Sequence, residues 1–85
     1  MKIIVIRVDD EYLPAVAKNY KAAIRFLIDE GWIDEGTEIW IDEEDKFITI
    51  EEAGIKIEDI KNYDRDTFEK YFGYDYELVD RELVE

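Results

Sequence analysis

Carboxylates are the only abundant side chains in this sequence that could carry chemistry. The chain holds 24 Asp plus Glu against 11 Lys plus Arg, with no His, no Cys and no Ser, for a formal net charge of −13 over 85 residues. Pairs of Ser or Cys with His, thiolate zinc sites and disulfides are therefore excluded. We expect a non-enzymatic protein without a cofactor, whose site is built from acidic and aromatic side chains.

Two uses of these carboxylates would be an enzyme or a calcium site. A pair of carboxylates can hydrolyse a glycosidic bond, but it needs a cleft for which a chain of 85 residues has little room. Calcium loops place their donors at alternate positions around a glycine. Neither residues 34–36 nor the acidic run at residues 42–45 has this spacing. A carboxylate enzyme and a calcium site are therefore the least favoured alternatives.

The negative charge is concentrated in the middle of the chain. Residues 1–28 have a net charge of 5 − 3 = +2, residues 29–52 of 1 − 11 = −10, and residues 53–85 of 5 − 10 = −5. Direct nucleic-acid binding is not expected, because phosphate contacts need clustered Lys and Arg. An anionic membrane surface would also repel this chain. A localised charge of this size predicts a binding surface for a basic protein.

Ten residues make up the predicted surface. Carboxylates at alternate strand positions or on successive helical turns can imitate a row of DNA phosphates, and they attract proteins that have a basic groove. Trp40, opposite in parity to Ile39 and Ile41, is expected to face solvent as an aromatic anchor. The predicted partner-binding residues are Glu38, Trp40, Asp42, Glu43, Glu44, Asp45, Glu51, Glu52, Glu58 and Asp59.

These residues must be positioned by short strands and helices. A β-branched run at residues 3–8 predicts a central strand covered on both faces. Residues 9–18 read as a loop, with a helical turn that could begin at Pro14. Asn19 can cap a helix that ends at Gly31, and Trp32 is then placed to fold back on Leu27. We therefore expect one domain over residues 1–85.

Two alternating runs, at residues 38–41 and 46–50, predict a hairpin with a four-residue loop. Thr49 and Glu52 have the spacing of a capping box, and the helix that follows carries Gly54 in its interior. Asp64 can cap a short helix closed by Gly73, and residues 74–79 alternate as a last strand. The order β-α-β-β-α-α-β predicts an α+β fold, with about four strands in an antiparallel or mixed sheet and helices on one side.

Residues 19–32, 49–53 and 68–72 resemble small acidic proteins of phages and mobile elements of AT-rich bacteria. The size and charge of the chain are also similar to those of anti-CRISPR and anti-restriction inhibitors. Several of those families occupy the DNA-binding surface of a nuclease. They share acidity rather than a motif, so the resemblance implies an inhibitor of a bacterial defence nuclease that acts as a DNA mimic, without assigning individual residues.

Other interpretations stay open. A small regulatory or antitoxin-like adaptor would depend on Trp40 and on the aromatic residues 63–76 more than on total charge. A homodimer could form through an exposed sheet edge. The N-terminal residues lack the apolar run of a signal peptide or a membrane span, so a cytoplasmic protein of a bacterial host cell is expected.

Overall fold

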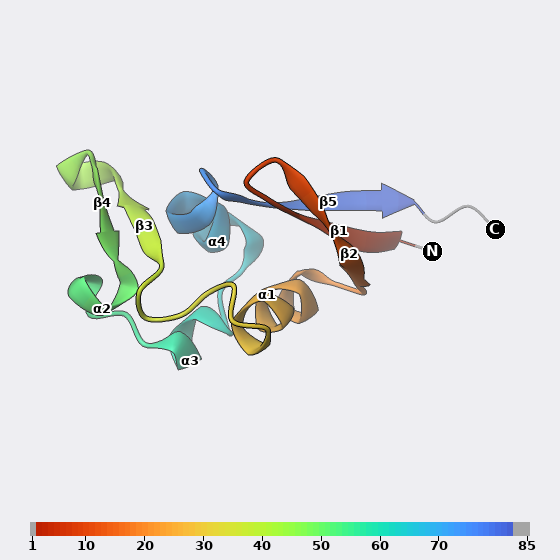
Figure 1. The fold of residues 1–85 in the computed structure, drawn as a ribbon, viewed down its shortest axis with the longest axis horizontal. Coiled ribbons are helices and arrows are strands. Elements are labelled where there is room, and N and C mark those ends of the chain that lie inside the picture. Colours follow the sequence, from red (N-terminus) through yellow and green to blue (C-terminus); the bar gives the residue numbers. More distant parts are fainter. Residues whose placement is uncertain (1, 83–85) are drawn as a thin grey trace.

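The computed structural model describes residues 2–82 and is α+β, as predicted. Figure 1 shows one sheet and the chain ends on one side, a separate hairpin on the other side, and helices between and below them. The elements are β1 (Lys2–Val8), β2 (Glu11–Ala17), α1 (Tyr20–Asp29), β3 (Glu38–Ile41), the 3₁₀ turn η1 (Asp42–Glu44), β4 (Lys46–Thr49), α2 (Ile50–Ala53), α3 (Ile57–Ile60), α4 (Arg65–Phe72) and β5 (Tyr76–Glu82).

The larger sheet has three antiparallel strands in the order β2-β1-β5, so the prediction that β1 is central is confirmed. Its two faces differ, however. Ile4, Ile6 and Val8 are buried, whereas the residues that alternate with them are only half-buried, so the prediction that both faces are covered was wrong. The predicted loop at residues 9–18 was also wrong. Most of it forms β2, which tolerates Pro14 because β2 is an edge strand.

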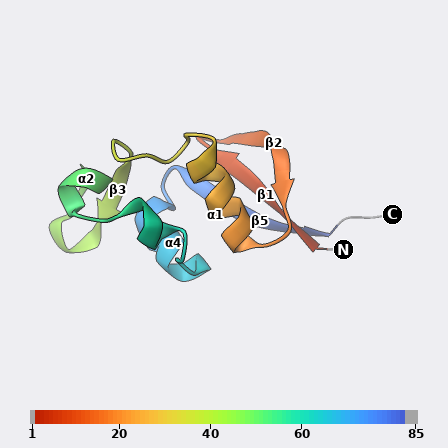
Figure 2. The same ribbon diagram turned by 90° about the horizontal axis from the view of Figure 1, so that it is seen from below.

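Helix α1 lies across the inner face of this sheet, as Figure 2 shows from below. The predicted cap is confirmed: the Asn19 side chain accepts a hydrogen bond from the Ala22 N–H at 2.8 Å. Gly31 follows the helix with φ +83°. Trp32 is 44% exposed, and Ile33 takes the buried place instead, with its N–H bonded to the Leu27 carbonyl. The prediction that Trp32 folds back on Leu27 was therefore wrong by one residue, because Ile33 occupies the buried position.

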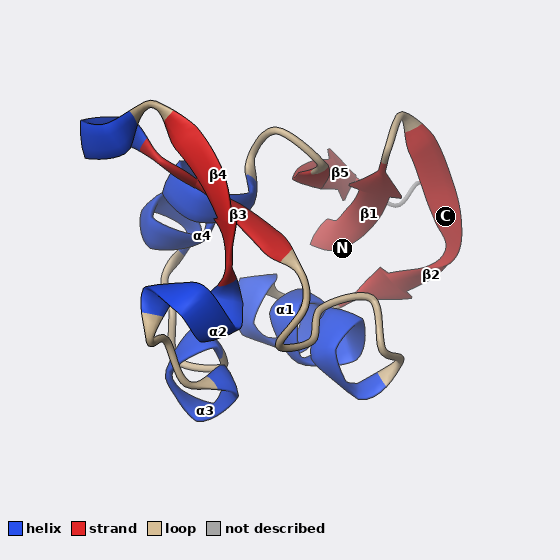
Figure 3. Cartoon of the chain, turned by 60° about the vertical axis from the view of Figure 1, so that its left-hand side comes forward, coloured by secondary structure: helices blue, strands red, loops and turns tan. Residues whose placement is uncertain are grey.

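The hairpin β3–β4 forms a second sheet of two strands, so the single sheet of about four strands is replaced by two smaller ones. The hairpin itself and its four-residue connection agree with the prediction. Figure 3, coloured by secondary structure, shows the hairpin as a sheet separate from the strands β1, β2 and β5. The hairpin faces the core through Ile39, which is fully buried and lies on β3, the strand that contacts α4.

The helices after the hairpin are short. The capping box at Thr49 is confirmed, since its hydroxyl oxygen accepts from the Glu52 N–H at 3.1 Å. Gly54 has φ +73° and separates α2 from α3, so residues 50–60 do not form one helix. The Asp64 carboxylate caps α4 by accepting from the Thr67 N–H at 2.8 Å, as predicted.

A single cluster of buried side chains joins all these parts. It includes residues from β1, α1, β3, α3, α4 and β5, among them Ile6, Leu27, Ile39, Ile60 and Phe68, all with no exposed surface. The hairpin is thus held by the same core as the larger sheet. Over residues 2–82, every helix is too short or too polar to cross a bilayer.

Candidate functional site

The hairpin tip is an acidic turn with a defined backbone. Asp42–Glu44 form the 3₁₀ turn, and the N–H of Asp45 donates to the Asp42 carbonyl at 3.2 Å. Asp45 lies in the left-handed region at φ +50°, which Asp tolerates better than most residues. All four tip acids are exposed, and Lys46 lies 3.6 Å from the Glu44 carboxylate. The turn therefore holds its carboxylates outward.

The ten predicted residues lie on β3, the hairpin tip, α2 and α3, and Figure 1 shows β3, the tip and α2 at the left of the molecule, with α3 below them. Alternation along β3 puts Glu38 and Trp40 on one face, and Asp42 follows at the same parity. Glu51 and Glu52 lie on α2, at the opposite end of the hairpin from the tip, and Glu58 and Asp59 lie on α3. Nine of these residues are acids and all nine are exposed. We call this region, residues 38–59, the acidic end.

Four of these acids already have partners. Glu44 lies 3.6 Å from the Lys46 ammonium group, and Asp42 accepts a hydrogen bond from the Trp40 indole N–H at 2.8 Å. The Glu52 carboxylate accepts a hydrogen bond from the Thr49 hydroxyl at 3.0 Å, and Glu58 lies 3.5 Å from the Lys61 ammonium group. Such exposed pairs contribute little energy and exchange easily for a new cation. Glu43, Asp45 and Glu51 are the acids of the acidic end best placed to meet a partner.

An aromatic cluster covers the outer face of the hairpin. Trp40 packs against Phe47 and Tyr74, with both pairs of ring centroids 5.0 Å apart, and the Phe47 and Tyr74 centroids are 5.5 Å apart. The indole N–H of Trp40 donates to the Asp42 carboxylate at 2.8 Å. Trp40 is half-buried rather than fully open to solvent, whereas Phe47 is 40% and Tyr74 66% exposed. We call these three residues the aromatic triad.

Phe47 and Tyr74 are not among the ten predicted residues, although Tyr74 lies within the aromatic residues 63–76 of the adaptor alternative. Phe47 could have been found, because a four-residue loop places it directly opposite Trp40 in the hairpin. Tyr74 was assigned to the last strand, whereas it precedes β5 and lies in the turn after Gly73. Its contact with the hairpin joins two distant parts of the chain, which periodicity does not report.

The triad is bordered by carboxylates. A surface hollow of about 210 Å³ is lined by Glu38, Phe47 and Asp75. Asp75 comes from the same turn as Tyr74. The Phe47 ring thus lies beside two carboxylates, Glu38 and Asp75, which come from different segments of the chain. This arrangement suits a guanidinium group, which can stack on the ring and donate hydrogen bonds to the acids.

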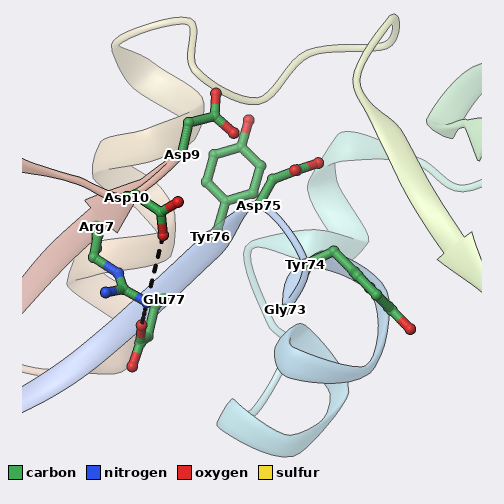
Figure 4. A pocket seen from close by; sticks show the side chains of 8 residues that line it. All are labelled: Arg7, Asp9, Asp10, Gly73, Tyr74, Asp75, Tyr76 and Glu77. Carbon is green, nitrogen blue, oxygen red and sulfur yellow. Dashed lines mark ion pairs between the residues drawn. The ribbon is translucent and has the colours of Figure 1, made fainter.

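A second hollow, also of about 210 Å³, lies where the β1–β2 turn meets the start of β5 (Figure 4). Arg7 is ion-paired there with Glu77 and, at 3.9 Å, with Asp10. The Asp9 N–H donates to the Asp75 carbonyl at 2.9 Å, and burial raises the pKa of Tyr76, whose hydroxyl donates to the Trp32 carbonyl at 2.7 Å. These contacts serve to join the turn to β5.

Neither region has the geometry of a metal centre. Among residues 2–82, no three acidic side chains are grouped so that they could hold a metal ion. Comparison of the chain with protein-family models, with curated proteins and with solved structures found no match. The function is therefore argued from the acidic end and the aromatic triad alone.

Proposed function

We propose that this protein is an inhibitor from a phage or mobile element that binds the basic nucleic-acid groove of a bacterial defence nuclease, such as a CRISPR effector or a restriction enzyme. Its acidic end takes the place of the DNA phosphates. The protein itself performs no reaction in this role and binds its partner by charge and shape.

The observation that carries this proposal is the clustering of exposed carboxylates at one end of the molecule. Residues 38–59 contain nine acids and two bases, a net charge of 2 − 9 = −7 within 22 residues. These acids are held on a hairpin and on the two short helices α2 and α3 rather than on an irregular tail. Binding then requires little ordering of the chain, which favours affinity, and the charge speeds association with a basic groove.

The aromatic triad gives this surface an anchor. Lys and Arg line the groove of a nuclease, and the hollow beside Phe47 offers an arginine a ring face together with Glu38 and Asp75. Aromatic residues at the centre of an interface commonly contribute more binding energy than the charges at its rim. Charge would therefore direct the approach of the partner, and the triad would hold it.

Capture of nucleases from a bacterial panel on the immobilised protein tests the electrostatic part. Binding is expected at low salt and should weaken steeply as salt is raised, because counterions screen exposed charges. Absence of binding at low salt, or binding that does not change with salt, would contradict the proposal.

A triple charge reversal locates the surface. Changing Glu43, Glu44 and Asp45 to Lys makes the net charge less negative, from −13 to −7, and binding should fall at least tenfold. A control with Glu11, Asp29 and Glu30 changed to Lys has the same net charge, and all three are exposed outside the acidic end. Equal loss in both variants would show that total charge, and not the hairpin tip, is responsible.

The aromatic triad also supports a second candidate, a small regulatory or antitoxin-like adaptor that binds a basic protein without imitating DNA. The salt dependence of the wild type distinguishes the two. An adaptor should keep its binding at high salt, since buried aromatic contacts are little screened, and Phe47→Ala should abolish that binding. A DNA mimic should lose binding at high salt even with the triad intact.

A further inference from the structure

The larger sheet leaves one of its faces uncovered. On this face the register places Val5 between Val16 and Val79, and Arg7 between Tyr12 and Glu77. Tyr12 is 53% and Val16 59% exposed. We call the outer sheet face the side formed by Ile3, Val5, Arg7, Tyr12, Val16, Glu77, Val79 and Arg81.

The helices pack only on the other side. Ile4, Ile6 and Val8 point into the core, toward the side where Figures 1 and 2 show α1 and α4. Ile3, Val5 and Val79 are half-buried, but they are neither core residues nor among the half-buried residues packed against the core. Contiguous apolar residues that a fold leaves uncovered commonly mark an interaction surface.

This face also differs in charge from the rest of the molecule. Its charged residues are Arg7, Arg81 and Glu77, a net charge of 2 − 1 = +1 in a chain of −13. Arg7 is paired with Glu77, and Arg81 donates to the Tyr12 hydroxyl at 3.3 Å. Two copies of the chain would repel each other through the acidic end, whereas the outer sheet faces can approach without that repulsion.

We propose that a second copy of this chain packs on the outer sheet face, so that the two larger sheets meet face to face about a twofold axis. In this arrangement the same residues of both copies form the interface, with Tyr12 and the row of Val16, Val5 and Val79 at its centre. The acidic end is built from other elements and stays free in each copy. The dimer would present two acidic surfaces, which could add avidity toward a partner with two grooves.

The size of the face sets the strength of the dimer. Three strands of seven residues span about 23 Å by about 14 Å, so each copy offers about 300 Å². The total is well below the roughly 1,200 Å² of small stable interfaces. The dimer should therefore form in the micromolar to millimolar range and exchange quickly.

The salt dependence of the dimer differs from that of partner binding. Each copy carries a charge of −13, so screening lowers the repulsion between whole molecules and should strengthen the dimer. Binding of the acidic end to a basic groove should weaken under the same change. A result that contradicts the dimer therefore does not contradict the proposed function, and the reverse also holds.

Sedimentation velocity over micromolar to millimolar protein, at low and high salt, tests the dimer. Tyr12→Lys should raise the dissociation constant at least tenfold, although it makes the chain less negative. Tyr74→Lys is the matched control, because Tyr74 is 66% exposed, lies outside the outer sheet face, and changes the charge equally. Thermal melting checks the fold, and Val16→Lys replaces Tyr12→Lys if that variant melts early.

A mass that rises toward two chains with concentration, more so at high salt, and that falls in Tyr12→Lys but not in Tyr74→Lys, would support the proposal. A single-chain mass at every concentration and salt would overturn it. Equal loss of the dimer in both variants would overturn it as well, because the contact would then lie elsewhere.

Discussion

At the scale of single residues, the β1–β2 turn contains an unusual pair. Asp9 and Asp10 both have positive φ, at 50° and 68°, as the central residues of a two-residue type I′ turn require. Gly adopts this region without a steric cost, whereas Asp adopts it less readily, although it tolerates the region better than most other residues. The turn thus holds local strain next to the contact between Asp9 and Asp75.

Asp9→Asn combined with Asp10→Gly should stabilise the protein by about 0.5 to 1 kcal/mol, because Asn-Gly is the preferred pair in this turn. The Asp9 N–H, which bonds to the Asp75 carbonyl, is retained. Urea unfolding measures the gain. Asp9→Asn alone controls for the loss of a negative charge, and a double variant no more stable than this control would contradict the assignment of strain to Asp10.

Asp64 gives a pH-dependent prediction. The hydrogen bond from the Thr67 N–H, joined by one from the Thr67 hydroxyl, lowers the pKa of Asp64 below its ordinary value. The native state therefore binds this proton less readily than the unfolded chain. The stabilisation is present above the ordinary pKa and is lost as pH falls through the lowered one.

Asp64→Asn keeps an acceptor at the cap but removes the titration. At neutral pH we expect the wild type to have the higher urea midpoint, because the ionised cap also interacts favourably with the helix N-terminus. As pH falls below the ordinary pKa of Asp64 the difference should shrink, because protonation removes the charged form of the cap that the Thr67 hydrogen bonds favour. A difference between the two proteins that does not change with pH would contradict this account.

At the scale of elements, the break between α2 and α3 depends on Gly54. Its φ is +73°, and a Cβ built there would meet no atom within 4 Å. The cost of a side chain is therefore conformational, and Gly54→Ala should destabilise the protein by about 1 kcal/mol. Gly54→Asn should cost about half as much, because Asn tolerates this region. Chemical unfolding distinguishes the alternative: in a continuous helix, Gly54→Ala would stabilise.

The sequence predicts elements well where the signal is local. Asn19, Thr49 and Asp64 were each predicted as helix caps, and each accepts a backbone hydrogen bond in the structure. The hairpin and its acidic loop were found for the same reason. A cap or a tight turn is decided by residues three or four positions apart, which periodicity and spacing report directly.

Strand β2 was missed because its signals conflict. Pro14 argues against a strand interior, and an Asp-Asp turn is not the usual hairpin signal. The strand forms because β1 pairs with it at the edge of the sheet, and Pro14 lies in the irregular stretch between the paired residues Tyr12 and Val16. Whether a strand lies at the edge of a sheet depends on the tertiary structure, which local sequence patterns do not report.

The candidate site was predicted in part for a related reason. The acids and Trp40 follow one another along a hairpin and the helices after it, so the sequence groups them. Tyr74 and Asp75 reach the hairpin from the turn between α4 and β5, because α4 packs against β3. The acidic part of the surface was thus predictable, and the arginine-sized hollow beside it was not.

At the scale of the whole molecule, charge is distributed unevenly over a body of 45 × 23 × 20 Å. The acidic end has a net charge of −7, whereas Lys18, Lys21 and Arg25 border one surface hollow at α1. In the proposed role, an asymmetric field of this kind would turn the molecule as it approaches a basic groove, so that the acidic end arrives first. The triad beside that end would then meet the partner at short range.

Displacement of DNA from the captured nuclease tests the central claim most directly. The nuclease is loaded with a fluorescent DNA duplex, and the protein is titrated in at low salt, with the reversal of Glu43, Glu44 and Asp45 and its charge-matched control run in parallel. The wild type and the control should release the DNA, and the tip reversal should need at least tenfold more protein. Binding of the wild type to the nuclease while the DNA stays bound would contradict the claim that the acidic end occupies the nucleic-acid groove.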